Sequence, residues 1–161
     1  DLCLIILDFF TLGVLLFTLV QITYSVRYTN KNIKVTLINF FIIFIFIAFG
    51  YGIAILFIEE ISILLPISLF YGICLLVSVI KAIKASNNNL YTSKSKHMIV
   101  FGMVLFLLCD TCVALSNITM IFPLSGYIMT SLSAIASLLI WVFYLPSQFL
   151  LALSGNGRIS R

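Results

Sequence analysis

Five long apolar runs constrain this chain of 161 residues more than any other feature of its sequence. A bilayer has a hydrocarbon core of ~30 Å, and a helix that crosses it needs ~20 apolar residues. The runs therefore predict an all-α fold, a polytopic transmembrane helical bundle with five spans. The spans are expected near residues 10–26, 35–58, 61–80, 97–116 and 126–153. Residues 1–154 form one predicted transmembrane domain, and residues 155–161 form a polar C-terminal tail.

The composition agrees with this prediction. Hydrophobic residues make up 63% of the chain and charged residues 9%, whereas soluble domains are about 45–50% apolar and about 25% charged. This balance excludes an ordinary water-soluble globule and also a disordered chain. The lipid bilayer is thus a predicted partner, while the sequence leaves the oligomeric state open.

The charged residues indicate the topology. All nine Lys and Arg residues fall in the first and third connections or in the tail, whereas Glu59 and Glu60 form the second connection. By the positive-inside rule, the basic connections and the C-terminus are expected to be cytoplasmic. The third connection, around residues 81–95, is predicted to be a loop. Because the basic residues lie between apolar runs rather than on one solvated face, they do not indicate a nucleic-acid partner.

The start of the chain predicts either that the N-terminus was processed or that earlier residues are absent. The sequence opens on Asp1, without an initial methionine and without the basic segment that precedes the apolar core of a signal peptide. We therefore expect the first residues to be the end of an upstream element.

Asp110 is the one charged residue that topology does not explain. It lies inside the fourth predicted span, and ionisable residues within a span usually face the bundle interior or a water-filled cavity. It is therefore the leading candidate for a catalytic residue. The structural alternative is that Asp110 only accepts hydrogen bonds from Thr111, Ser116 or a tyrosine of a neighbouring helix.

Several uncharged polar side chains are candidates for the same cavity. Gln21 and Tyr24 share one face of the first span, and Tyr144 and Gln148 share one face of the last. Tyr71 lies in the middle of the third span, where its hydroxyl needs a partner. Each of these groups either lines a substrate site or makes an ordinary hydrogen bond between helices.

The sequence predicts neither a metal site nor a cofactor. Cys109 and Cys112 form a C-x-x-C pair without a second pair, and tetrahedral zinc needs four ligands. The four cysteines are therefore expected to be free thiols packed in helices. The chain also lacks the G-x-S-x-G, H-E-x-x-H and Walker motifs. Paired carboxyl groups remain, and two of them can divide general-acid and general-base work.

Three segments of the chain resemble the YhhN family of integral membrane proteins, the lysoplasmalogenase-like group. Asp8–Tyr28 is similar to the helix of that family with the pattern G-x-x-x-F followed by (H/Q)-x-x-Y, and Gln21 and Tyr24 match its end. Gly102–Leu115 resembles the L-F-x-x-S-D segment, with Cys109 in place of serine and Asp110 as the acid. Trp141–Gly155 resembles the closing Y-x-x-x-Q helix through Tyr144 and Gln148.

This resemblance implies an activity and a longer protein. Members are expected to hydrolyse the vinyl ether bond of a lysophospholipid, lysoplasmalogen, giving a fatty aldehyde and a glycerophospho-alcohol. They are expected to have about eight helices, so the N-terminal helices are expected to be missing here. Asp1 stands where the family has a second aspartate, which makes Asp110 and Asp1 the candidate acid and base. Gln21, Tyr24, Tyr71, Tyr144 and Gln148 are the candidate substrate-binding residues.

Two other classes of function stay open at this point. A non-enzymatic lipid-binding or lipid-transport protein would use Asp110 as a polar hinge or proton site, with binding but no turnover. An accessory subunit of a larger membrane complex would have an apolar face that a partner covers and would lack an enclosed polar cavity. The arrangement of Gln21, Asp110 and Gln148 would discriminate between these classes, because catalysis requires the three side chains to converge.

Overall fold

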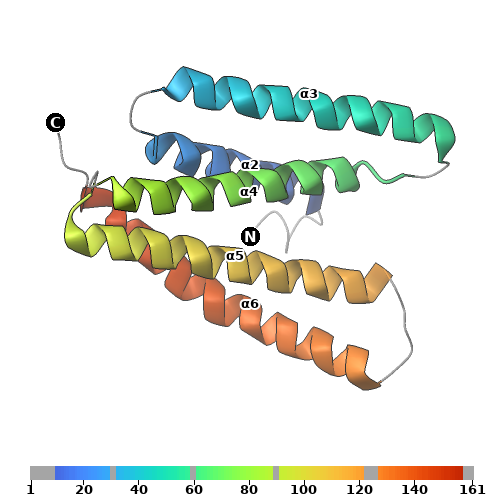
Figure 1. Ribbon diagram of the computed structural model, residues 1–161. Coiled ribbons are helices and arrows are strands. Elements are labelled where there is room, and N and C mark those ends of the chain that lie inside the picture. The colour runs from blue at the N-terminus through green and yellow to red at the C-terminus, as the bar shows by residue number, and fades with distance from the viewer. Residues whose placement is uncertain (1–9, 30–31, 59–60, 89–90, 122–126, 158–161) are drawn as a thin grey trace. The chain divides into compact units, whose positions relative to one another are not determined.

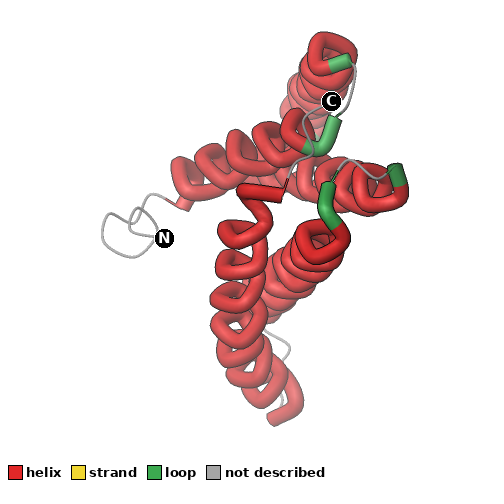
Figure 2. The backbone as a smooth tube through the Cα atoms, turned by 90° about the vertical axis from the view of Figure 1, so that its left-hand side faces the viewer, coloured by secondary structure: helices red, strands yellow, loops and turns green. Residues whose placement is uncertain are grey.

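The computed structural model describes residues 10–29, 32–58, 61–88, 91–121 and 127–157, apart from the side chains of residues 10, 117–121, 127–133, 156 and 157. Its regular elements are helical (Figure 2). They are α2 (Phe10–Arg27), α3 (Ile33–Phe57), α4 (Leu64–Asn87), α5 (Ser93–Ile121), α6 (Tyr127–Leu153) and a short 3-10 helix (Ser154–Gly157). The predicted all-α fold is confirmed.

Five spans were predicted, and among the described residues four helices are long and apolar enough to cross a membrane. These candidate spans are Ile33–Phe57, Leu64–Asn87, Ser93–Ser116 and Ala134–Leu153, and Thr11–Arg27 is a shorter apolar helix. In α3 the buried residues are Thr36 and Phe40, and the other described side chains are half-buried or exposed although they are mostly apolar. A helix that is apolar on all sides is stable only when lipid or protein surrounds it. The chain is therefore an integral, multi-pass membrane protein.

The helix ends differ from the sequence prediction in the polar segments. Residues 81–95 were expected to form a loop, but α4 continues to Asn87 and α5 begins at Ser93. The fourth span was expected to end near residue 116, but α5 continues to Ile121. Lys and Ala are good helix formers, so a helix does not stop where its apolar run stops. The first turn of α4 contains Pro66, where a missing backbone N–H costs little.

The chain divides into two compact units, residues 1–81 and residues 82–161. In the first unit, α3 packs on α4 through the rings of Phe44 and Phe70, whose centroids are 5.4 Å apart. Near the C-terminal end of α3, the Tyr51 hydroxyl donates a hydrogen bond to the carbonyl oxygen of Ile61 at 3.1 Å. These contacts join α3 to the start of α4 and to the link that precedes it.

In the second unit, α5 and α6 lie side by side and antiparallel (Figure 1). Three contacts fix their register: Gly102 against Leu151, the ring of Phe106 against that of Tyr144, and Cys109 Sγ donating to the carbonyl oxygen of Ile140. The helices approach most closely at Gly102. A Cβ atom added there would lie 2.9 Å from Leu151 Cγ, so any larger residue would have to displace the Leu151 side chain.

Candidate functional site

The predicted site residues divide between the two units. Asp110, Tyr144 and Gln148 belong to the second unit, while Gln21, Tyr24 and Tyr71 belong to the first. Asp1 lies outside the described residues. The convergence of all these side chains on one cavity therefore stays a prediction.

Asp110 lies in the middle of the long apolar helix α5 and is half-buried. It follows the buried Cys109 and is one turn beyond Phe106, whose ring centroid lies 6.4 Å from that of Tyr144. Its place one turn along α5 from Phe106 puts it next to the face that packs on α6. The carboxyl group is thus close to the level of Ile140, one turn from Tyr144.

The register of α5 and α6 puts Gln148 at a different level from Asp110. Gln148 is eight residues beyond Ile140, which corresponds to about 12 Å along a helix. It is half-buried, and its neighbour Ser147 is fully buried. The Ser147 hydroxyl has no hydrogen-bond partner among the described residues. Within this unit, Tyr144 is thus the predicted binding residue nearest to the level of Asp110.

Gln21 is fully buried and contacts α4. Its Oε1 atom lies 2.7 Å from the hydroxyl of Ser78, which also lies 2.8 Å from the carbonyl oxygen of Leu75. A hydroxyl has one proton, so Ser78 donates to one of these oxygens at a time. The other end of the amide, Nε2, has no partner among the described residues. Gln21 therefore keeps a hydrogen-bonding group available in a buried place.

Tyr24 follows Gln21 by about one turn of α2, and Tyr71 is on the same helix as Ser78, α4. Tyr24 is half-buried, and its ring stacks on that of Tyr28 with centroids 6.0 Å apart. Tyr71 is half-buried on α4 and precedes Ser78 by seven residues, two helical turns, which is about 10 Å. The seven-residue spacing places it on the same stripe of α4 as Ser78.

Three polar residues of the first unit were not among the predicted site residues. Ser25 follows Gln21 by one turn, is fully buried, and its hydroxyl has no partner among the described residues. Ser78 is the partner of Gln21, and Lys81 follows it by one turn. The ammonium group of Lys81 donates to the hydroxyls of Thr29 at 2.9 Å and Thr36 at 2.6 Å. The sequence could have indicated these residues through their spacing, because Ser25 follows Gln21 by one helical turn and Lys81 follows Ser78 by one turn.

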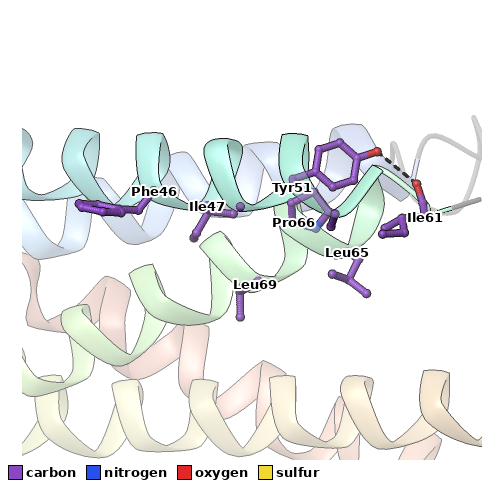
Figure 3. Close-up of a pocket in the computed structure, with 9 residues that line it drawn as sticks. Phe46, Ile47, Tyr51, Ile61, Leu65, Pro66 and Leu69 are labelled. Atoms are coloured by element: carbon purple, nitrogen blue, oxygen red, sulfur yellow. Dashed lines mark hydrogen bonds between the residues drawn. The ribbon is translucent and has the colours of Figure 1, made fainter. Parts of the chain in front are cut away.

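A separate apolar pocket lies between α3 and α4 (Figure 3). Its volume is about 380 Å³, and its lining residues are Phe46, Ile47, Gly50, Tyr51, Ala54, Ile61, Leu65, Pro66 and Leu69. The Tyr51 hydroxyl, the main polar group of the lining, is bonded to the Ile61 carbonyl oxygen. The pocket can hold a hydrocarbon segment, but none of the predicted site residues lines it.

The cysteines are free thiols wherever they are described. Cys74, Cys109 and Cys112 are buried and form no disulfide, in agreement with the prediction for these three. In the described ranges, no group of three or more His, Cys, Asp or Glu side chains is placed to hold a metal ion.

Comparison with known proteins extends the resemblance seen in the three segments. The model of the YhhN family matches residues 1–155. The chain belongs to the YhhN family. This family includes lysoplasmalogenases. No curated protein and no solved structure matches the chain.

The hydrogen bond between Gln21 and Ser78 gives a first test of this YhhN-family structure. We expect Ser78→Ala to lower the free energy of unfolding by about 1 kcal/mol. The substitution leaves the buried Gln21 Oε1 atom without its donor, and hydrogen bonds between membrane helices contribute about this much. The matched control is Ser68→Ala, which removes an exposed hydroxyl from the same helix. Unfolding of the purified protein in mixed detergent micelles measures both. Equal stabilities for the two variants would contradict the buried hydrogen bond.

Proposed function

We propose that this YhhN-family protein is a membrane-embedded hydrolase that cleaves the vinyl ether bond of lysoplasmalogen. The observation that carries the proposal is Asp110, a carboxyl group in the apolar candidate span Ser93–Ser116 of a family that includes lysoplasmalogenases. An acid at this depth has no role in topology, and intramembrane carboxyl groups usually serve function.

The chemistry that such a group supplies is proton transfer to carbon. A carboxylic acid, Asp110 or Asp1, gives its proton to the alkenyl carbon that is not bonded to oxygen, and the adjacent carbon becomes an oxocarbenium ion. The other carboxylate stabilises this cation and removes a proton from the attacking water. The resulting hemiacetal breaks down to a fatty aldehyde and a glycerophospho-alcohol, so that one water molecule is consumed in each cycle.

The remaining predicted residues would position the reactants. Tyr144, one turn from the level of Asp110, is proposed to orient the water or the ether oxygen. Gln148, Gln21, Tyr24 and Tyr71 are proposed to contact the polar part of the substrate, and the alkenyl chain would lie among apolar side chains. The basic connections and the C-terminus are proposed to be cytoplasmic.

The direct test is turnover by the full-length protein in liposomes. We expect aldehyde to be released from lysoplasmalogen, and none from the saturated alkyl-ether analogue, which has no enol ether carbon to protonate. A lipid-binding or lipid-transport protein, the alternative, would bind or move both lipids without releasing aldehyde. Absence of aldehyde from a folded, lipid-binding preparation would overturn the hydrolase and favour that alternative.

A further inference from the structure

We propose that the first unit binds the glycerophosphate part of a phospholipid in a polar column, formed by Gln21, Ser25, Thr29, Thr36, Ser78 and Lys81. The phosphate would pair with Lys81, and the glycerol or ester oxygens would meet Ser25 and Gln21. This site goes beyond the proposed hydrolysis, because its recognition of phosphate does not depend on cleavage of an ether bond.

The arrangement of the column follows from contacts between α2, α3 and α4. Gln21 bonds to Ser78, and further along the chain Thr29 bonds to Lys81. The two contacts occur in the same order along α4 and along the segment from α2 to Thr29, two residues beyond that helix, so Ser25 lies at a level between them. Thr36, in the first turn of α3, closes the column at the Lys81 end, with its hydroxyl 3.3 Å from that of Thr29.

Lys81 has hydroxyl partners but no described counter-ion in its unit. The hydroxyls of Thr29 and Thr36 can each donate to a backbone carbonyl oxygen, of Ser25 at 2.7 Å and of Asn32 at 3.3 Å, so their lone pairs face the ammonium group. An ammonium group has three N–H bonds, and two of them point to these hydroxyls. The described residues of the first unit include no Asp or Glu. Among the described residues of this unit, no group uses the positive charge or the third donor, and the phosphate would take both.

The unpartnered groups beside Lys81 favour a lipid over a free phosphate ion. Both Ser25 and Gln21 are fully buried, and each has a polar atom without a partner among the described residues. An unpartnered polar atom in such a place costs free energy that a bound oxygen atom would recover. In a phospholipid the glycerol oxygens lie just below the phosphate, as Ser25 and Gln21 lie below Lys81. Inorganic phosphate supplies no such oxygens.

The expected depth of Lys81 in the bilayer matches that of a lipid headgroup. Thr29 and Thr36 flank the connection between α2 and α3, and Arg27 and Lys34 are in the terminal turns of these helices. Basic residues at helix ends lie at the level of lipid headgroups. The phosphate of a lipid that is inserted in the same leaflet therefore lies at the depth of Lys81.

The test compares two lipids with identical acyl chains, phosphatidic acid and diacylglycerol, bound to the delipidated full chain in detergent and counted by native mass spectrometry. We expect Lys81→Met to lower the affinity for phosphatidic acid by about 10- to 100-fold, as for loss of a charge-assisted hydrogen bond. Affinity for diacylglycerol should not change. The matched control, Lys84→Met, removes the exposed lysine one turn further along α4 and should change both affinities by less than about twofold.

A second variant keeps the test decisive if Lys81→Met fails to fold. Ser25→Ala removes a hydroxyl without a described partner, so the fold should be retained. It should weaken the binding of both lipids by about threefold to tenfold, as for loss of one hydrogen bond. Lipid affinities that are equal in the wild type, Lys81→Met and Ser25→Ala would overturn the site. Lys81-dependent binding of inorganic phosphate without Lys81-dependent binding of phosphatidic acid would overturn the assignment to a lipid.

The glycerophosphate can come from a bilayer phospholipid or from the proposed substrate, and the aldehyde assay distinguishes the two. A rise in KM for lysoplasmalogen in Lys81→Met identifies the substrate as the source, whereas weaker phosphatidic acid binding with an unchanged KM identifies a bilayer lipid. If the wild type releases no aldehyde, the hydrolase proposal fails, and the binding measurement still decides on the column.

Discussion

Asp110→Asn is expected to lower the rate of aldehyde release by about 100- to 10,000-fold, because the amide can neither give a proton to the enol ether carbon nor stabilise the cation as a carboxylate does. Asparagine has nearly the same shape as aspartate, so the helix pair α5 and α6 should be retained. The measurement is initial-rate aldehyde release from lysoplasmalogen in liposomes, with protein folding checked by the unfolding temperature of each preparation. The loss should appear in kcat, because proton transfer occurs in the transition state.

The control for this variant is its neighbour on α5. Thr111 is exposed, and its hydroxyl donates to the carbonyl oxygen of Leu107 in the same helix. Thr111→Val keeps the size of the side chain and should leave kcat within about twofold, because surface substitutions have small effects. Activity that survives Asp110→Asn at the level of Thr111→Val would exclude Asp110 as the acid. The hydrolase would then have to use another group.

Gly102→Leu is expected to disrupt the packing of α5 on α6 and to lower the unfolding free energy by about 3 kcal/mol or more. A Cβ atom at this position would lie 2.9 Å from Leu151 Cγ, 3.0 Å from Leu151 Cδ2 and 3.4 Å from Leu150 Cβ. Gly102→Ala should cost less, about 1–3 kcal/mol, partly offset by the better helix propensity of alanine. Unfolding in mixed detergent micelles measures both variants.

A second-site change tests whether the clash is the cause. Leu151 is buried, so Leu151→Ala alone should cost about 2–5 kcal/mol through the cavity that it leaves. In the double variant, Gly102→Ala with Leu151→Ala, the new methyl group at residue 102 occupies part of that cavity. The double variant should therefore lose less unfolding free energy than the sum of the losses in the two single variants. Gly72→Ala is the control, because a Cβ atom there has no neighbour within 4 Å. Additive costs would exclude a direct contact.

The helices themselves were predictable from the sequence, but several of their ends were not. Apolar runs of about 20 residues have few alternatives in a membrane, so the elements from Phe10 to Leu153 appear near the predicted positions. The ends of α4 and α5 extend into the polar segments on either side of residues 88–92. The end of an apolar run marks where the lipid ends, whereas helix formation depends on backbone hydrogen bonds that polar residues also support.

The candidate site was predictable only as a set of residue types. Asp110 is conspicuous in sequence because a carboxyl group in an apolar span is costly. The pairing of Gln21 with Ser78 joins residues that are 57 positions apart, and no local pattern specifies it. Lys81 was assigned to topology alone, since charge counts do not reveal that its ammonium group bonds to Thr29 and Thr36. Long-range packing, which the sequence does not encode locally, supplied these partners.

The length and exposure of α3 make the protein sensitive to the thickness of its bilayer. A helix of 25 residues is about 37 Å long, whereas the hydrocarbon core is about 30 Å thick. Because so few of its side chains are buried, α3 can respond to this mismatch by tilting against lipid. Tyr51 and Thr36 bond α3 to the link before α4 and to Lys81. A thinner or thicker membrane would therefore act on both ends of α4 through a helix that carries none of the predicted site residues.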